Sequence, residues 1–282
     1  MFESILSELE CSQFHLHGIE LLKGGETVLH KSYGADVRLP VYSVTKSLTS
    51  AAFCLAVGDG LLSPELPLAQ FLEKRCCLPE GFEKLPFERF LTMTAGGYPF
   101  RPQGENWLDY IFSLDTDFSD TAFHYSNIPA YLVGAACENA VGGDLMAYLE
   151  KRLFEPLGIP RPTFVKSPEG HFYGATGMEL TVRELALLGQ LYLQKGKWQN
   201  QQLISSELVS RSVSPIVPTD SGDSYGWFVR AADDHFSFVG KWGQRCMVYP
   251  QKELVIAYLS HNPDSSQQLY QLIRDFTAAN IQ

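Results

Sequence analysis

The sequence predicts an α+β fold in which an antiparallel β-sheet is flanked by N- and C-terminal helices and an all-helical lobe is inserted. Strand patterns occur near both ends of the chain, within residues 14–33 and 225–259. Helical patterns occupy the two termini, and the middle of the chain is helical but broken by prolines. One sheet covered by the terminal helices would bury the apolar faces of all these segments.

The first elements are a helix and a hairpin. Residues 1–10 form an acidic amphipathic helix pattern, without the basic start and long apolar run of a secretory signal. Residues 14–22 and 26–33 have strand patterns on either side of Gly24-Gly25. This arrangement predicts a hairpin with a glycine turn.

The stretch from Pro40 to Val57 predicts a largely buried helix that begins near Ser43 and ends at Gly58 and Gly60. Ser43 and Lys46 are three residues apart, so their Cβ atoms would lie roughly 5–6 Å apart on one helix face. Such a pair can make an activated serine nucleophile if the lysine pKa falls from about 10.4 towards neutrality. Burial and the helix dipole both favour that fall. A plainer alternative is that Ser43 caps the helix while Lys46 extends to solvent.

Residues 61–113 are expected to form short helical pieces, because prolines interrupt them at positions 64, 67, 79, 86, 99 and 102. A loop then delivers the triplet Tyr125–Asn127 just before a buried helix that opens at Ile128-Pro129. Here too the plain alternatives are a core tyrosine and a helix-capping asparagine.

Two further helices are predicted over residues 143–154 and 181–193, the second with a capping box formed by Thr181 and Glu184. The pattern then changes to strands, with turn residues that favour antiparallel pairing. The expected strands cover residues 226–230, 236–240, 247–249 and 253–259, with turns at 233–234 and 250–251 and a last helix at about 263–279.

The segment Gly222–Gly226 matches the Gly-x-Ser-x-Gly pattern of a nucleophile elbow, with Ser224 at its centre. That elbow requires a strand before the serine and a helix after it. Here a loop precedes the serine and a strand is predicted to follow, so Ser224 is interpreted as a loop residue.

The composition is that of an ordinary globular protein, with 45% hydrophobic and 19% charged residues. The formal net charge of −10, without a compensating basic run, argues against nucleic acid and anionic membranes as partners. No segment approaches the ~20 apolar residues of a membrane span. We therefore expect small-molecule partners and a cytoplasmic protein.

No metal or cofactor is expected. His15 and His17 would share one strand face, but no third ligand is evident, so solvated strand histidines are the interpretation. Cys76-Cys77 lacks a second pair at zinc-ligand spacing. Cys54 and Cys137 lie in apolar helical contexts and are interpreted as core thiols.

Three triplets occur in an order that resembles one enzyme family: Ser43-Val-Thr-Lys46, Tyr125-Ser-Asn127 and Lys241-Trp-Gly243. They resemble the three signatures of the penicillin-recognising serine hydrolases, in particular the class C β-lactamase and D,D-peptidase branch. Other resembling segments extend the likeness over nearly the whole chain: residues 91–97, 155–159, 181–204 and 240–248.

The resemblance implies a role for each matching residue. Ser43 would form an acyl-enzyme, while Lys46 and Tyr125 would share the acid–base work. Asn127 would bind the substrate or orient Lys46, and Lys241 and Gly243 would lie on a strand edge that lines the cleft. The backbone N–H groups of Ser43 and Gln244 would form the oxyanion hole.

The resemblance also implies two parts with the active site in the cleft between them: residues 1–66 plus 175–282 around the sheet, and residues 67–174 as the helical domain. Trp242 departs from the family pattern, which usually has Thr or Ser there to help bind a substrate carboxylate. An indole cannot accept that role and would add apolar bulk. This favours a small ester or amide over a β-lactam or D,D-peptide substrate. A non-catalytic binding relative is the alternative of another class.

Overall fold

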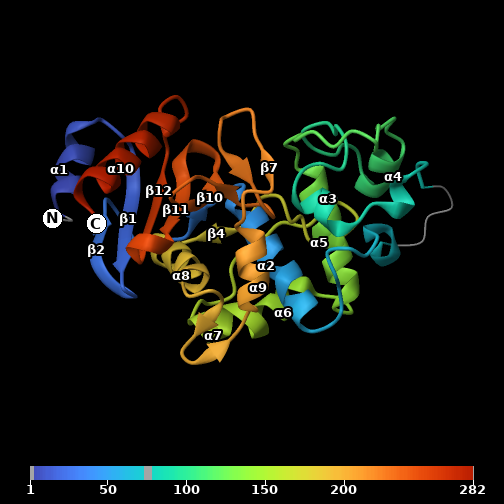
Figure 1. The fold of residues 1–282 in the computed structure, drawn as a ribbon, viewed down its shortest axis with the longest axis horizontal. Coiled ribbons are helices and arrows are strands. Elements are labelled where there is room, and N and C mark those ends of the chain that lie inside the picture. The colour runs from blue at the N-terminus through green and yellow to red at the C-terminus, as the bar shows by residue number, and fades with distance from the viewer. Residues whose placement is uncertain (1–2, 73–77, 282) are drawn as a thin grey trace.

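The computed structural model describes residues 3–72 and 78–281 of the chain. The Cys76-Cys77 pair lies outside these residues. An eight-stranded sheet occupies one side of the molecule and a group of helices the other (Figure 1). The predicted α+β class is confirmed.

Neighbouring strands in the large sheet pair antiparallel to each other. The order of the strands is β2-β1-β12-β11-β10-β9-β8-β7, so strands from the two ends of the chain meet in the sheet through β1 and β12. The bounds are β1 Leu16–Lys23, β2 Glu26–Ser32, β7 Val217–Pro218, β8 Ser224–Tyr225, β9 Arg230–Ala231, β10 Phe236–Gly240, β11 Gln244–Tyr249 and β12 Leu254–Ser260.

The predicted N-terminal hairpin is confirmed. β1 pairs with β2, and Gly24 and Gly25 connect them with φ values of +60° and +88°. Glycine adopts such values without the steric penalty that a side chain would meet.

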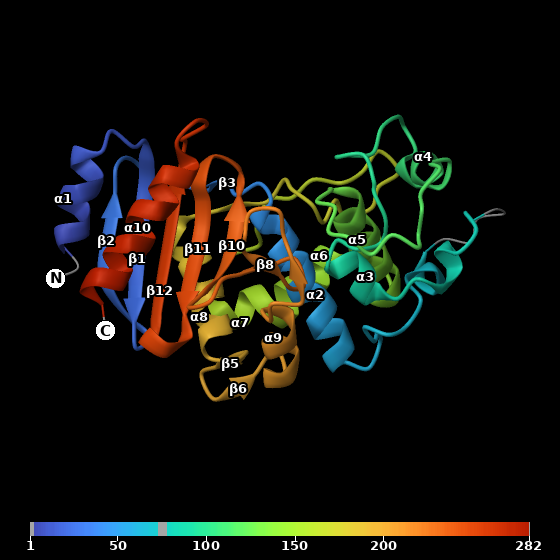
Figure 2. The same cartoon turned by 45° about the horizontal axis from the view of Figure 1, so that its top comes forward.

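Two helices at the chain ends cover one face of the sheet, as Figure 2 shows: α1 (Glu3–Cys11) and α10 (Ser266–Asn280). Their buried residues Ile5, Leu9 and Ile273 pack with Leu21 and Met247 of the sheet. The opposite face packs against α8 (Val182–Leu193), whose Thr181–Glu184 capping box is present as predicted.

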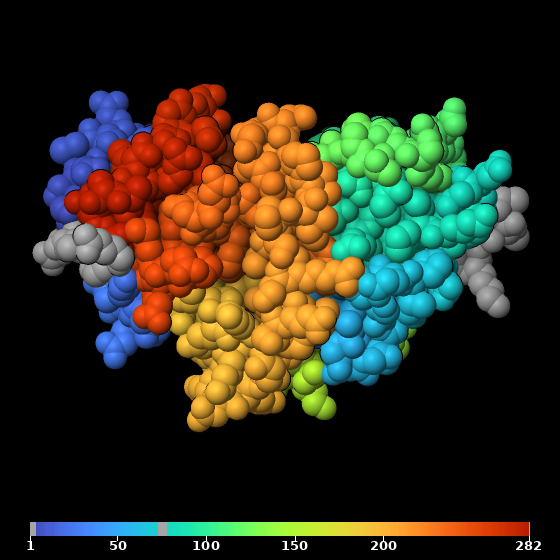
Figure 3. Space-filling view, in the orientation of Figure 1, coloured from blue at the N-terminus to red at the C-terminus, as the bar shows by residue number. Residues whose placement is uncertain are grey.

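A single hydrophobic core continues from that second face into the helical part, joining Leu48 and Phe53 of α2 (Val44–Gly58) to Phe87, Leu132 and Val255. In the space-filling view the orange stretch that includes β7 and β8 lies directly against the green and cyan helical residues (Figure 3). The helical part contains α3 (Phe87–Leu91), α4 (Trp107–Phe112), α5 (Ile128–Ala140) and α6 (Leu145–Leu149), together with 3-10 turns at Leu68–Phe71 and Phe82–Lys84.

The helix predicted over residues 143–154 is shifted. It begins at Leu145, because the side chain of Asp144 caps it by accepting from the Ala147 N–H. It continues through a π-helical turn at Glu150–Phe154 into α7 (Glu155–Leu157) and ends at Gly158, where φ is +70°. The smaller elements are β3 Leu39–Pro40, β4 Glu179–Leu180, β5 Lys197–Trp198, β6 Gln201–Gln202, α9 Ser206–Ser212 and a 3-10 turn at Pro250–Lys252.

The strand predicted over residues 226–230 is wrong. A tight turn lies between β8 and β9, closed by a hydrogen bond from the Gly226 N–H to the Val229 carbonyl (2.9 Å). Phe228 has a φ of +55°, which no strand residue adopts. Ser224 belongs to the two-residue strand β8, not to a loop, and the helix that an elbow would need does not follow it.

Candidate active site

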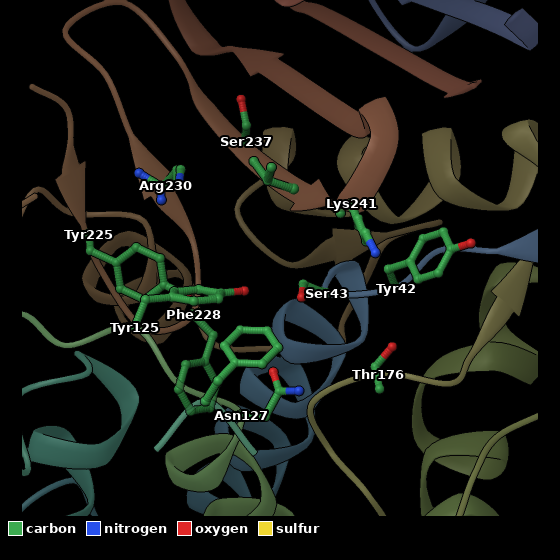
Figure 4. Close-up of a pocket in the computed structure, with 13 residues that line it drawn as sticks. Tyr42, Ser43, Tyr125, Asn127, Thr176, Tyr225, Phe228, Arg230, Ser237 and Lys241 are labelled. Atoms are coloured by element: carbon green, nitrogen blue, oxygen red, sulfur yellow. The ribbon is translucent and has the colours of Figure 1, made fainter. Parts of the chain in front are cut away.

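A cavity of about 420 Å³ lies where the sheet meets the helical part. Its lining includes Ser43 from the start of α2, Tyr125 and Asn127 from the loop that leads into α5, and Lys241 from the turn after β10. Figure 4 shows these side chains converging from separate elements. The cavity is therefore assembled from all three of the resembling triplets.

Ser43 lies at the entry to α2, where its backbone is already helical and its side chain makes no capping hydrogen bond. The capping alternative for Ser43 does not hold in this structure. The segment before Ser43 is anchored to the residue that precedes β4, since the Val41 N–H donates to the Met178 carbonyl at 3.0 Å. The hydroxyl is thus left available to the cavity and to Lys46.

Lys46 is only 1% exposed, so the alternative in which it extends to solvent is also contradicted. Its Nζ contacts three oxygens: Ser43 Oγ at 3.0 Å, Asn127 Oδ1 at 2.7 Å and the Ala175 carbonyl at 3.0 Å. Burial lowers the pKa of the Lys46 amine, and its interactions with Tyr125 act in the opposite direction.

This arrangement can accommodate a neutral amine. The Asn127 and Ala175 oxygens belong to carbonyl groups, which accept hydrogen bonds and cannot donate them. A neutral amine has two N–H bonds and one lone pair. If the two N–H bonds serve these carbonyls, the lone pair is directed at Ser43, whose hydroxyl can then donate to it.

Asn127 is held on its other side as well. Its Nδ2 donates to the Tyr173 hydroxyl at 3.0 Å, which fixes the amide with its oxygen towards Lys46. The side chain makes no capping bond to α5, so it is committed to these two partners and not to the helix.

Tyr125 forms the wall opposite Ser43 and projects towards it in Figure 4. Lys46 Nζ lies 4.9 Å from the centroid of the Tyr125 ring. The ring packs edge-on against Tyr225, with the centroids 6.3 Å apart. The phenol therefore has a packed, aromatic support and faces the serine–lysine pair.

The third triplet is a turn and not a strand edge. Lys241–Gly243 connect β10 to β11, and Gly240 pairs directly with Gln244 across the turn. Lys241 lines the cavity, but Trp242, Gly243 and Gln244 are not among the residues that line it. The substrate contacts expected of Trp242 and Gly243, and the oxyanion role expected of the Gln244 N–H, remain predictions.

Each of the three has another partner. Trp242 packs against Tyr42 and His261. A Cβ on Gly243 would lie 2.4 Å from Ser260 Oγ, so its missing side chain makes room for the neighbouring strand and not for a substrate. The Gln244 side chain is buried and bonded to the backbone of Ser260.

Several lining residues were not predicted: Tyr42, Thr176, Tyr225, Phe228, Arg230 and Ser237. Ser237 could have been found, because alternation along the predicted strand places it on the same face as Val239, which also lines the cavity. Phe228 could not, since its position depends on the turn between β8 and β9. The charge of Arg230 is paired, with its Nη1 lying 2.8 and 3.0 Å from the two carboxylate oxygens of Asp223.

A sequence model of the beta-lactamase family matches residues 19–277. The chain belongs to the beta-lactamase family. A search of curated proteins gives no match. The family resemblance drawn from the three triplets is confirmed.

Solved structures of beta-lactamase-family proteins and related hydrolases share this fold. A candidate beta-lactamase from Bacteroides dorei DSM 17855 has a TM-score of 0.81 at 17% identity, covering 98% of both chains. A candidate 6-aminohexanoate-dimer hydrolase from Bacillus anthracis has a TM-score of 0.80 at 16% identity, covering 97% of this chain and 80% of its own. A beta-lactamase/D-alanine carboxypeptidase from Pseudomonas syringae has a TM-score of 0.76 at 14% identity, covering 96% of this chain and 97% of its own.

Within residues 3–72 and 78–281, no helix has both the length and the apolar character to cross a membrane. In the same residues, no group of three or more His, Cys, Asp or Glu side chains is arranged to hold a metal ion. His15 and His17 lie close to His261, and the pKa of His17 is lowered by burial and by these two neighbours.

Proposed function

We propose that this protein is a serine hydrolase that forms an acyl-enzyme on Ser43 with a small ester or amide substrate. The observation that carries the proposal is the contact of 3.0 Å between Ser43 Oγ and the buried Nζ of Lys46. Two other oxygens bonded to that amine belong to carbonyls, which cannot take a proton, so Lys46 is our candidate to accept the proton of Ser43.

In the first half-reaction, the Ser43 O–H bond breaks, its proton moves to Lys46 Nζ, and Oγ bonds to the substrate carbonyl carbon. The bond to the leaving alcohol or amine then breaks, and that group takes a proton from Lys46 or from the Tyr125 hydroxyl. In the second half-reaction, water gives a proton to the same groups as its oxygen bonds to the acyl carbon. The bond between that carbon and Ser43 Oγ then breaks, Oγ takes the proton back, and the acid is released. The backbone N–H of Ser43 is our candidate for one oxyanion donor.

The size and lining of the cavity support a small substrate. A volume of about 420 Å³ is near the lower end of small-molecule sites. Aromatic side chains, among them Tyr42, Tyr125 and Phe228, form much of its lining, while Lys241 provides a positive charge. The Bacillus anthracis neighbour, named for hydrolysis of the 6-aminohexanoate dimer, adds support for a hydrolase of small molecules.

Beta-lactamase or D,D-peptidase activity is the second candidate. It is favoured by the family itself and by the name of the Pseudomonas syringae neighbour. The position of Trp242 argues against it, because no hydroxyl group stands beside Lys241 in the turn to help bind a substrate carboxylate.

A fluorophosphonate probe tests the nucleophile. We expect the wild type to be labelled, Ser43→Ala to lose the label, and Ser224→Ala to keep it as the matched control. Esters, nitrocefin and D-Ala-D-Ala peptides then distinguish the substrate classes. Absence of labelling and of turnover on every substrate would support the non-catalytic binding protein instead.

A further inference from the structure

Trp242 occupies the centre of the turn between β10 and β11 and has a φ of +63°. A large side chain rarely adopts this left-handed conformation. Two hydrogen bonds hold its carbonyl: the Asn262 N–H donates at 2.9 Å and the Ser260 hydroxyl at 3.0 Å. The turn is therefore fixed to the end of β12, and the direction of the indole is fixed with it.

The indole contacts two residues that line the cavity, although it does not line the cavity itself. Its ring packs edge-on against Tyr42, with centroids 5.1 Å apart and planes at 73°. Lys241 Nζ lies 4.3 Å from the centroid of the same ring, within the range of a cation–π contact. His261 packs on the indole as well, at 4.5 Å between centroids.

Tyr42 directly precedes the proposed nucleophile and is also left-handed, with a φ of +48°. Such a conformation persists in a non-glycine residue only when its surroundings hold it. The next residues depend on it: the Thr45 N–H donates to the Tyr42 carbonyl at 3.1 Å and the Lys46 N–H to the Ser43 carbonyl at 3.0 Å. Whatever fixes Tyr42 also fixes the first turn of α2.

The turn is pressed closely against this entry to α2. A Cβ on Gly240 would lie 2.3 Å from the Val41 carbonyl oxygen, so no side chain fits between the two segments. The Trp242 ring adds a second contact between the turn and this segment by packing against Tyr42. The same ring also packs against His261.

We propose that Trp242 is a positioning residue. It holds Tyr42 in its left-handed conformation, and so fixes the first turn of α2 that carries Ser43, and it keeps the Lys241 ammonium at the cavity. This inference rests on the proposed function for its effect on catalysis, but its effect on the backbone does not depend on activity. Trp242 would thus order the site through its contact with Tyr42, at a position where the family usually has a residue that helps to bind the substrate.

Hydrogen exchange measured by mass spectrometry tests the backbone part. In Trp242→Ala, we expect amides in peptides covering residues 40–46 to exchange at least tenfold faster than in the wild type. Trp242→Phe retains a ring and should restore slow exchange. Trp198→Ala removes another half-buried indole, from β5 outside the cavity, and should leave these peptides unchanged. If Trp242→Ala is too unstable to measure, Trp242→Leu replaces it, with the same expected result.

Kinetics with the ester that the wild type hydrolyses best tests the catalytic part. We expect Trp242→Ala to lower kcat about 10- to 100-fold with less than a threefold change in KM, and Trp242→Phe to recover most of kcat. Unchanged exchange at residues 40–46 would overturn the proposal, whether or not activity falls. Faster exchange in a protein that hydrolyses nothing would leave the positioning role in place and count against the proposed function alone.

Discussion

A lysine that is almost wholly buried among oxygens is the residue on which the proposed chemistry depends. Lys46 Nζ is bonded to the oxygens of Ser43, Asn127 and Ala175, and none of these is a carboxylate that would balance the charge of an ammonium group. Desolvation therefore dominates and lowers its pKa. A lower pKa increases the fraction of neutral amine at a given pH, and only the neutral amine can take the proton of Ser43.

The pH dependence of activity follows from this. The rate should fall as the pH is lowered through the pKa of Lys46, because the amine becomes protonated, and this fall should lie below the ordinary lysine value. Lys46→Arg should lower kcat/KM by about 10²- to 10⁴-fold at every pH, since a guanidinium does not deprotonate in proteins. Profiles of kcat/KM against pH measure both effects.

Lys151→Arg serves as the control, because this lysine is exposed on the helical part. Its profile should coincide with that of the wild type. A Lys46→Arg enzyme that retained a normal rate would show that another group takes the proton.

At the scale of elements, the segment between α7 and β4 completes the site. It contributes the Ala175 carbonyl and the Tyr173 hydroxyl, which contact Lys46 and Asn127. Gly174 lies between them, and a Cβ there would lie 2.6 Å from the Ala130 carbonyl oxygen and 2.7 Å from Thr49 Oγ1. This segment is thus pressed between α2 and α5.

Gly174→Ala should force the segment away from both helices. We expect it to destabilise the protein by about 1–3 kcal/mol, as overpacking typically does, and to lower kcat by weakening the contact of Ala175 with Lys46. Urea unfolding and ester hydrolysis measure the two effects. Gly58→Ala is the matched control, because a Cβ at that position meets nothing within 4 Å. Equal behaviour of the two variants would contradict the close packing described here.

Elements defined by local signals were predictable from the sequence. The glycine turn of the first hairpin, the Thr181–Glu184 capping box and the helix after Ser43 all depend on neighbouring residues. The turn at Phe228 was not predictable, because distant groups hold it: its N–H donates to the Leu91 carbonyl at 3.0 Å, and its carbonyl accepts from Ser47 Oγ at 2.9 Å.

The same distinction applies to the candidate site. The motif triplets identified Ser43, Lys46, Tyr125, Asn127 and Lys241, all of which lie at or beside the cavity. The direction of the Trp242 side chain depends on a left-handed backbone and on contacts with residues far away in the sequence. A motif specifies which residues occur but not which way a turn points them.

At the scale of the whole molecule, the question is whether the two parts fold together. The proposed division separates residues 1–66 plus 175–282 from residues 67–174. Yet one hydrophobic core includes residues of both, and the backbone bond between Phe228 and Leu91 joins them at the cavity. A shared core of this kind couples the stability of its halves. We therefore expect one cooperative unfolding unit.

Three buried thiols can report on this directly. Cys137 lies in α5 of the helical part, Cys246 in β11 of the sheet, and Cys54 in α2 between them. Burial raises the pKa of all three, that of Cys54 to about 12, so the folded protein should protect them from alkylation. Cys11 is exposed and should react at every urea concentration, which makes it the internal control.

Alkylation at increasing urea concentrations, followed by mass spectrometry of each cysteine, gives one unfolding curve for each part of the molecule. Because one core joins the two parts, the curves of Cys137 and Cys246 should share a midpoint and a slope, and that of Cys54 should follow them. A midpoint for Cys137 well below that of Cys246 would mean that the helical part opens while the sheet stays folded. The cavity would then be lost before the fold, because Tyr125 and Asn127 stand at the start of the helix that carries Cys137.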